Sequence, residues 1–336
     1  MKNRKVKNWF LMLLLLSLFL LMVCVLAICT GSAGIPVQKI PEILINGKGT
    51  VEHSILFSIR LPRLMLALSI GGALSLAGVL LQGMFRNPLV EPYTLGISGG
   101  ASLGVCLNII FKWYVVLGVI AYPLSGFLGA VLVIAIVYSI SMKKGDLKTN
   151  NMLLIGVMIS FVSSSVVMLL MAISHSEDLH SIIFWIMGSL DEPNMILVKI
   201  AVTVSIAGLI LSYFFCLDLN ALALGEEEAI HLGIQTERTK RCLFIIASTL
   251  TGMSVSVAGI IMFVGLIVPH FMRMFVGQDH RILLISSFLA GAAFLTVCDV
   301  ISRTIVAPLE LPVGVITGII GGVIFIYVLS RKQVLL

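Results

Sequence analysis

Long apolar stretches alternate with short polar segments along the chain, and this pattern predicts a bundle of membrane-spanning helices. A helix of about 20 residues crosses the roughly 30 Å hydrocarbon layer of a bilayer. Ten stretches fit that length, at about 9–29, 62–83, 93–111, 115–140, 151–174, 193–215, 241–258, 261–277, 282–303 and 313–330. We therefore expect an all-α, polytopic membrane protein with ten transmembrane helices in a single domain, residues 1–336. The seventh and eighth helices share the segment around Gly259 and Pro269, which leaves their mutual boundary open.

One polar segment interrupts this pattern between the second and third expected helices. The second helix begins near Pro62 and is rich in small residues such as Gly71 and Gly78, which let another helix approach closely. It ends in a polar run that contains Gln82, Arg86, Asn87, Pro88, Glu91 and Pro92. Non-helical backbone at membrane depth must be covered by protein or line a water-filled path. We therefore expect this break to form part of a conduit.

The composition and the charge distribution agree with a membrane protein. Hydrophobic residues make up 59% of the chain and charged residues only 11%, against about 25% charged residues in soluble domains. A cytoplasmic N-terminus would place 15 of the 22 Lys and Arg residues in cytoplasmic segments and 7 on the outer side, as the positive-inside rule requires. Both termini are therefore expected in the cytoplasm. The net charge of +6 reflects this orientation and does not indicate a nucleic-acid partner.

The longest predicted cytoplasmic loop, residues 216–240, has the pattern of two short helices. Asp218 and Gly225 would begin and end the first of them, and the run Glu226, Glu227, Glu228 would begin the second, which Gly233 ends. Acidic residues in a first turn favour the helix dipole, and glycine suits the position after a helix. The loop is either a compact acidic element or a solvated connection between two spans.

Several motifs occur in one order and resemble a known family. They include R-L-P-R, R-N-P-L, L-G-E-E-E-A and E-L-P-V-G. Together they resemble the permease subunits of type II ATP-binding-cassette (ABC) importers, the FecCD family, which moves iron–siderophores, haem and cobalamin. The resemblance implies a bacterial cytoplasmic membrane, a second permease subunit (an identical chain or a paralogue), two cytoplasmic ATPase subunits and an extracytoplasmic binding protein. The chain contains no G-x-x-x-x-G-K-[ST] motif, so we expect no enzyme activity here and ATP with Mg²⁺ used by the partner ATPase.

The resemblance also implies three groups of site residues. The predicted docking site for the binding protein is Arg60, Arg63 and Arg303; the alternative is interfacial snorkelling with an Asp299–Arg303 ion pair. The predicted ATPase-coupling element is Leu224, Gly225, Glu226, Glu227, Glu228, Ala229, Leu232 and Gly233. The predicted cytoplasmic gate is Asn87, Leu89, Thr149 and Asn150; the alternative for Thr149 and Asn150 is helix capping.

No metal site or bound cofactor is expected in this chain. The six cysteines form no C-x-x-C pair. His175 and His180 flank Glu177 and Asp178, but a spacing of five does not place two histidines on one helical face. Glu310, before Pro312, is expected to have a structural role in the last turn between helices.

The expected function is import of an iron(III)–siderophore, with haem and cobalamin as alternatives on a similar scaffold. A secondary transporter driven by protons or sodium is the main alternative of another class. It would place carboxylates or histidines at mid-membrane as ion relays. Here Asp299 and Glu310 lie near the ends of the expected helices. An intramembrane enzyme is a third possibility, but no catalytic pair is visible in the sequence, which has no H-E-x-x-H motif.

Overall fold

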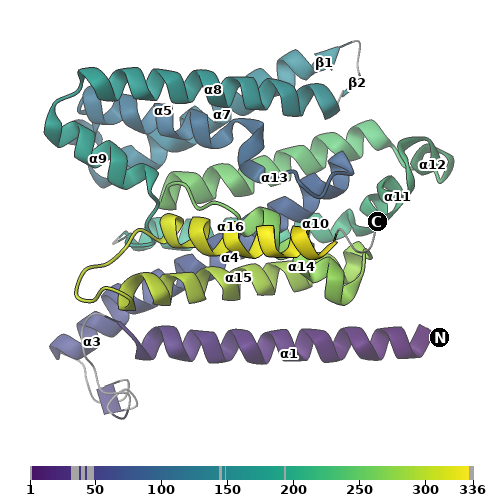
Figure 1. The fold of residues 1–336 in the computed structure, drawn as a ribbon, viewed down its shortest axis with the longest axis horizontal. Coiled ribbons are helices and arrows are strands. Elements are labelled where there is room, and N and C mark those ends of the chain that lie inside the picture. The colour runs from purple at the N-terminus through teal and green to yellow at the C-terminus, as the bar shows by residue number, and fades with distance from the viewer. Residues whose placement is uncertain are drawn as a thin grey trace.

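The computed structural model describes residues 2–31, 38, 42–43, 49–143, 146–147, 149–192 and 194–332. Its long helices run in roughly the same direction and pack side by side (Figure 1). They are α1 (Lys2–Cys29), α4 (Leu61–Phe85), α5 (Ile97–Ile110), α7 (Ala121–Ser141), α8 (Thr149–Ile173), α10 (Met195–Phe214), α13 (Thr236–Ala258), α14 (Val264–Val276), α15 (His280–Thr304) and α16 (Val313–Lys332).

Short elements connect these helices. They are α3 (Val51–Ile55), the π-helical turn η2 (Leu56–Arg60), the 3-10 turns η3 (Pro92–Leu95) and η4 (Gly118–Ile120), α6 (Trp113–Leu117), α9 (Ser176–Ile186), α11 (Cys216–Leu224) and α12 (Glu226–His231). Two strands of two residues each, β1 (Met142–Lys143) and β2 (Asp146–Leu147), form an antiparallel pair before α8.

The all-helical, polytopic fold is confirmed. Within the described residues, seven helices are long and apolar enough to cross a membrane. Three shorter apolar helices, α5, α14 and α16, coincide with the remaining expected spans. The boundary between the seventh and eighth spans lies at residues 259–263, where Gly259 and Phe263 both have positive φ angles, +69° and +68°.

The second span extends further than expected. Helical structure is continuous from Val51 to Phe85 and passes through η2 before it reaches Pro62. Pro62 has no N–H to complete the regular hydrogen-bond ladder, and π-turns are one way in which a helix accommodates such a local irregularity. Here the N–H of Leu61 bonds the carbonyl oxygen of Leu56, five residues earlier.

Helix α4 forms the centre of the molecule. It packs against α10, α13, α14 and α15, and 89% of its most apolar window is buried. Small residues permit this packing: Gly71 lies against the backbone of Gly291 in α15, and Gly78 lies against that of Gly265 in α14. The expected close approach of helices to this span is thus present on two sides.

A methyl group at Gly78 should therefore be costly. Its Cβ would overlap the carbonyl oxygen of Gly265, which belongs to backbone and cannot rotate away. We expect Gly78→Ala to destabilise the protein by about 1–3 kcal/mol, as overpacking typically does. The matched control is Gly252→Ala in α13, where the nearest atom to the new Cβ would be that of Ala130 at 3.5 Å. Thermal unfolding in detergent gives the midpoint of each variant, and equal midpoints for Gly78→Ala and Gly252→Ala would contradict the prediction.

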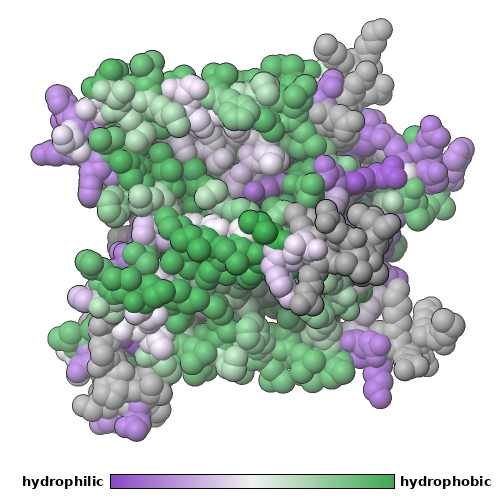
Figure 2. Space-filling view, viewed as in Figure 1, coloured by the Kyte–Doolittle hydropathy of each residue, from purple (hydrophilic) through white to green (hydrophobic). Residues whose placement is uncertain are grey.

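The two ends of the bundle carry different elements. The N- and C-terminal ends lie at the same end as α11 and α12, whereas α3 and α9 lie at the opposite end (Figure 1). Figure 2 shows a mainly apolar band, drawn green, between these ends, with hydrophilic residues in purple near both margins. The long helices therefore cross the apolar band from one polar margin to the other.

Candidate functional site

Helices α11 and α12 form a compact element, the first of the two alternatives that the sequence left open for this loop. Helix α11 ends at Gly225 (φ +149°), where a side chain would collide with the carboxylate of Glu228. Helix α12 ends before Gly233 (φ +86°), and the N–H of Ile234 donates to the carbonyl oxygen of Ala229 at 3.0 Å. Ala229 is fully buried, so the small side chain lets the turn close on itself.

This element is tied to the transmembrane helix α13. Lys240 in α13 is only 3% exposed. Its ammonium group pairs with the carboxylate of Glu226 and, at 3.2 Å, with that of Glu237. The hydroxyl of Thr239 donates to Asp218 in α11 at 2.9 Å. The acidic residues predicted to favour the helix starts therefore also anchor both short helices to α13.

A second anchor joins α11 to the start of α15. Asn220 donates from Nδ2 to Asp279 Oδ1 at 3.1 Å, and its Oδ1 accepts from the backbone N–H of His280 at 2.8 Å. Hydrogen bonds from Arg281, followed by the bond from Asn220, hold the pKa of Asp279 below its ordinary value. The element is fixed to two membrane helices and presents exposed apolar side chains at Leu224, Ile230 and Leu232, which are 65%, 55% and 62% exposed.

The expected gate residues lie at the same end of the bundle. Asn87 Oδ1 accepts from the N–H of Leu89 at 2.9 Å, which fixes the turn after α4 and leaves Leu89 55% exposed. Thr149 and Asn150 are the first residues of α8, but their side chains lie outside the described part of the chain.

Protein covers the polar break beyond this turn, as its depth requires. Gln82 Nε2 donates to the carbonyl oxygens of Val90 and Gly265 at 3.2 Å. Glu91 Oε1 accepts from the N–H of Phe263 at 2.7 Å. The break after α4 and the irregular segment between α13 and α14 thus satisfy each other's backbone groups.

The three arginines predicted for docking come together at the opposite end, and all three are buried, at 4–5% exposure. Arg63 Nε donates to Asp299 at 2.7 Å, and its Nη1 donates to Glu310 at 2.5 Å. Arg303 Nη2 lies 3.0 Å from the same Asp299 carboxylate. The alternative Asp299–Arg303 pair is thus present, and the structural role expected for Glu310 takes the form of an ion pair with Arg63.

Arg60 and Arg303 also hold the end of α1. Arg60 Nη1 donates to the carbonyl oxygen of Ile28 at 2.7 Å, and Arg303 Nη2 donates to that of Ala27 at 3.4 Å. The last carbonyl groups of a helix have no hydrogen-bond donor within the helix. At the end of α1, two guanidinium groups provide the donors. The sequence predicts that these arginines lie at one end of the bundle. It does not predict that their side chains point into the protein, because the Arg-x-x-Arg spacing carries no information on the partners of each guanidinium group.

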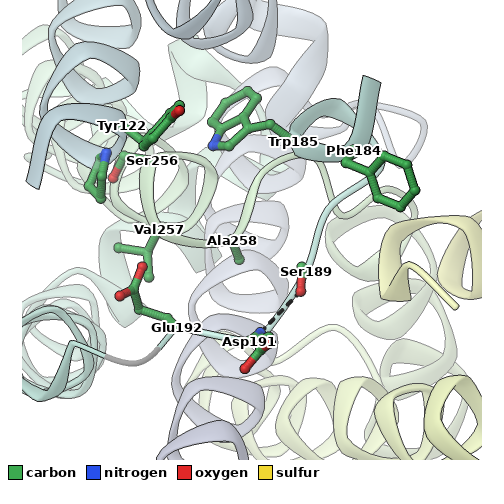
Figure 3. A pocket seen from close by; sticks show the side chains of 10 residues that line it. Tyr122, Phe184, Trp185, Ser189, Asp191, Glu192, Ser256, Val257 and Ala258 are labelled. Atoms are coloured by element: carbon green, nitrogen blue, oxygen red, sulfur yellow. Dashed lines mark hydrogen bonds between the residues drawn. The ribbon is translucent and has the colours of Figure 1, made fainter. Parts of the chain in front are cut away.

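A cavity that the sequence did not indicate opens at the same end as the arginines. Its volume is about 280 Å³, and it lies between α7, α9, the loop after α9 and the end of α13. Figure 3 shows Tyr122 and Trp185 on one side and the acidic residues Asp191 and Glu192 on the other, with the bond from Asp191 N–H to Ser189. Burial raises the pKa of the Glu192 carboxyl above its ordinary value. The cavity thus combines aromatic rings with two acidic side chains.

In the described part of the chain, no group of three or more His, Cys, Asp and Glu side chains could hold a metal ion. His175 precedes the first turn of α9, and the ring of His180 packs on that of Phe184 with centroids 4.4 Å apart. His175 therefore lies just before α9 and His180 lies within it.

Comparison with known proteins identifies the family. Residues 18–331 match the FecCD transport family. The chain is 34% identical over 322 residues to the hemin transport system permease protein HmuU of Yersinia pestis, covering 95% of this chain and 96% of that protein. It is 39% identical over 277 residues to the cobalamin import system permease protein BtuC of Halobacterium salinarum, covering 82% and 73%. It is 39% identical over 285 residues to the Fe(3+) dicitrate transport system permease protein FecD of Escherichia coli, covering 85% and 88%.

Among solved structures, a metal-chelate type ABC transporter in an inward-facing conformation has the same fold. The TM-score is 0.83 at 29% sequence identity, over 96% of this chain and 99% of that one. Sequence and structure thus agree over nearly the whole length. The chain belongs to the FecCD transport family and is a multi-pass ABC transporter permease.

Proposed function

We propose that this chain is the membrane-spanning subunit of an ABC importer that moves an iron(III)–siderophore from a binding protein into the cytoplasm. The family membership supports an importer of siderophores, haem or cobalamin. Haem and cobalamin remain the alternative substrates, because related permeases are named for each. The substrate passes between two copies of the permease or between this chain and a paralogue.

The observation that carries this proposal is the α11–α12 element. It is tied to α13 by Lys240 and Thr239 and to the start of α15 by Asn220, and these contacts connect the element directly to two membrane helices. Its exposed apolar side chains suit a groove on a partner ATPase. The proposed division of labour leaves ATP hydrolysis, with its Mg²⁺, to that partner, and gives this chain no catalytic residue and no cofactor.

The proposed orientation places α11, α12 and both termini in the cytoplasm. The opposite end, with α3, α9 and the buried arginines, then faces the binding protein. Docking there remains our prediction for Arg60, Arg63 and Arg303. In the single chain these guanidinium groups are engaged inside, so a docking partner would first meet Glu310, whose side chain is 36% exposed and pairs with the buried Arg63.

The ion pairs of Asp299 argue against an ion-coupled transporter. This carboxylate is 1% exposed, as an ion relay could be, and it is held between Arg63 and Arg303 near the end of α15. An ion relay needs a carboxylate that can exchange its proton or cation, and two charge-assisted bonds oppose that exchange.

Reconstitution tests the proposed function. The chain is placed in proteoliposomes with its ATPase, the binding protein is added outside, and uptake of radiolabelled ferric siderophore, haem and cobalamin is measured with Mg-ATP inside. We expect uptake of the ferric siderophore that stops when ATP or the ATPase is omitted. Preferred uptake of haem or cobalamin would reassign the substrate. Uptake driven by an ion gradient without the ATPase would refute the importer mechanism.

A further inference from the structure

A second cavity, of about 300 Å³, lies at the α11–α12 end of the bundle. The turn after α4 forms one wall, and α11, the end of α14 and the start of α15 form the others. Its polar lining residues are Gln82, Arg86, Asn87, Arg273, Gln278 and His280. The lining includes two arginines and no carboxylate, so the cavity carries positive charge.

The two arginines reach the cavity from different elements. Arg273, half-buried in the last turn of α14, donates from Nη1 to the amide oxygen of Gln82. Arg86 is exposed and closes α4 in the left-handed conformation, with φ +51° and ψ +33°. Within the described residues, neither guanidinium group has a carboxylate within ion-pair distance, unlike Arg63, Arg281 and Arg303.

His280 supplies a buried polar atom with no partner. The ring Nδ1 lies 2.9 Å from Asn220 Oδ1, and Asn220 directs its Nδ2 to Asp279, so the oxygen must accept and Nδ1 must carry the proton. The other ring nitrogen, Nε2, therefore carries the lone pair and accepts a hydrogen bond, such as one from the hydroxyl of inorganic phosphate. It has no hydrogen-bond partner in the described part of the chain, although the residue is only 3% exposed. A methyl group at Gly83, also in the cavity wall, would lie 3.1 Å from this nitrogen.

We propose that this cavity binds a phosphate group. Two guanidinium groups with no carboxylate partner supply the positive charge and the N–H donors that a phosphate group binds. The start of α15 lies in the same wall, and the carboxylate that caps it, Asp279, is not among the lining residues and pairs with Arg281 instead. A cavity of this volume accommodates inorganic phosphate or the headgroup phosphate of an anionic lipid. Basic pockets between membrane helices on the cytoplasmic side commonly bind such headgroups.

A phosphate group bound here would contact the predicted gate. Asn87 belongs both to the cavity wall and to the turn that presents Leu89. Ala223 of α11 forms part of the opposite wall, so the bound group would lie between the gate turn and the proposed coupling element. The site goes beyond the proposed transport function, and its binding can be measured without cargo, binding protein or ATPase.

Two parallel binding measurements on the full-length chain test the site and identify its source of phosphate. In the first, protein depleted of lipid in a neutral detergent is dialysed to equilibrium against radiolabelled inorganic phosphate at low salt. In the second, protein is released from nanodiscs of phosphatidylcholine with phosphatidylglycerol, and retained phosphatidylglycerol is counted by native mass spectrometry. We expect saturable binding in at least one of the two measurements. Binding in the first identifies free phosphate as the ligand, and binding in the second identifies a lipid headgroup.

The variants are Arg86→Asn and Arg273→Gln, each expected to weaken binding about tenfold or more through loss of a charge-assisted contact. Asparagine tolerates the left-handed conformation of residue 86, so Arg86→Asn preserves the fold even if Arg273→Gln disturbs Gln82. The matched control is Lys112→Asn, which removes one positive charge from another left-handed residue (φ +55°) beyond α5. Absence of binding in both arms, wild-type binding by Arg86→Asn, or an equal loss in Lys112→Asn would overturn the proposal.

Discussion

Replacement of Asp299 by alanine should destabilise the protein by about 3–5 kcal/mol, the cost of leaving buried charges without their partner. Asp299 is 1% exposed and lies between Arg63 at 2.7 Å and Arg303 at 3.0 Å. Its loss leaves the two buried guanidinium groups of Arg63 and Arg303 without the carboxylate that both of them contact, while Glu310 keeps its ion pair with Arg63. A lower midpoint of thermal unfolding in detergent and a smaller yield of monodisperse protein are the expected readouts.

The control for this variant is Glu177→Gln in α9, an exposed acidic residue with no ion pair in the described part of the chain. A surface substitution of this kind changes stability by about 0.5 kcal/mol or less. The comparison separates loss of the buried network from a general effect of net charge. If Asp299→Ala unfolds at the wild-type midpoint, the buried ion network contributes nothing measurable to the fold.

The double variant Leu224→Asp, Leu232→Asp should insert and fold normally but fail to bind the ATPase. Both side chains are more than 60% exposed, so their replacement removes little packing within the chain. Burial of each leucine in a partner groove is worth about 1.5–3 kcal/mol, so loss of both weakens binding roughly 100-fold or more. Co-purification with the ATPase, or its affinity for the chain in nanodiscs, measures the effect.

Val116→Asp provides the matched control for the ATPase interface. Val116 in α6 is 86% exposed, and the replacement puts the same charge on an exposed apolar position away from α11 and α12. We expect this variant to retain the ATPase. Wild-type ATPase affinity in the double variant would show that α11 and α12 do not form the coupling surface.

The arginine cluster shows why a site residue can be predicted without its contacts. The sequence brings Arg60 and Arg63 together by their spacing, but Asp299 is 236 residues from Arg63 and Glu310 is 247 residues away. Only the packing of α15 against α4 brings these carboxylates within reach. A docking assay on variants of these arginines must therefore be accompanied by a stability measurement, because each substitution also breaks a buried contact.

Hydropathy by itself determined the helical character and the approximate positions of the apolar helices, because a chain in lipid must satisfy its backbone hydrogen bonds locally. The acidic run and glycines of residues 216–240 likewise determined two short helices. Only the tertiary structure decided which spans are central. The window of α1 has the higher mean hydropathy, 3.2, yet is 11% buried, whereas that of the span containing α4 has 2.2 and is 89% buried. Lipid and protein interior are similarly apolar, so hydropathy does not distinguish them, and the close fit of glycines such as Gly78 against neighbouring backbones decides which helix lies inside.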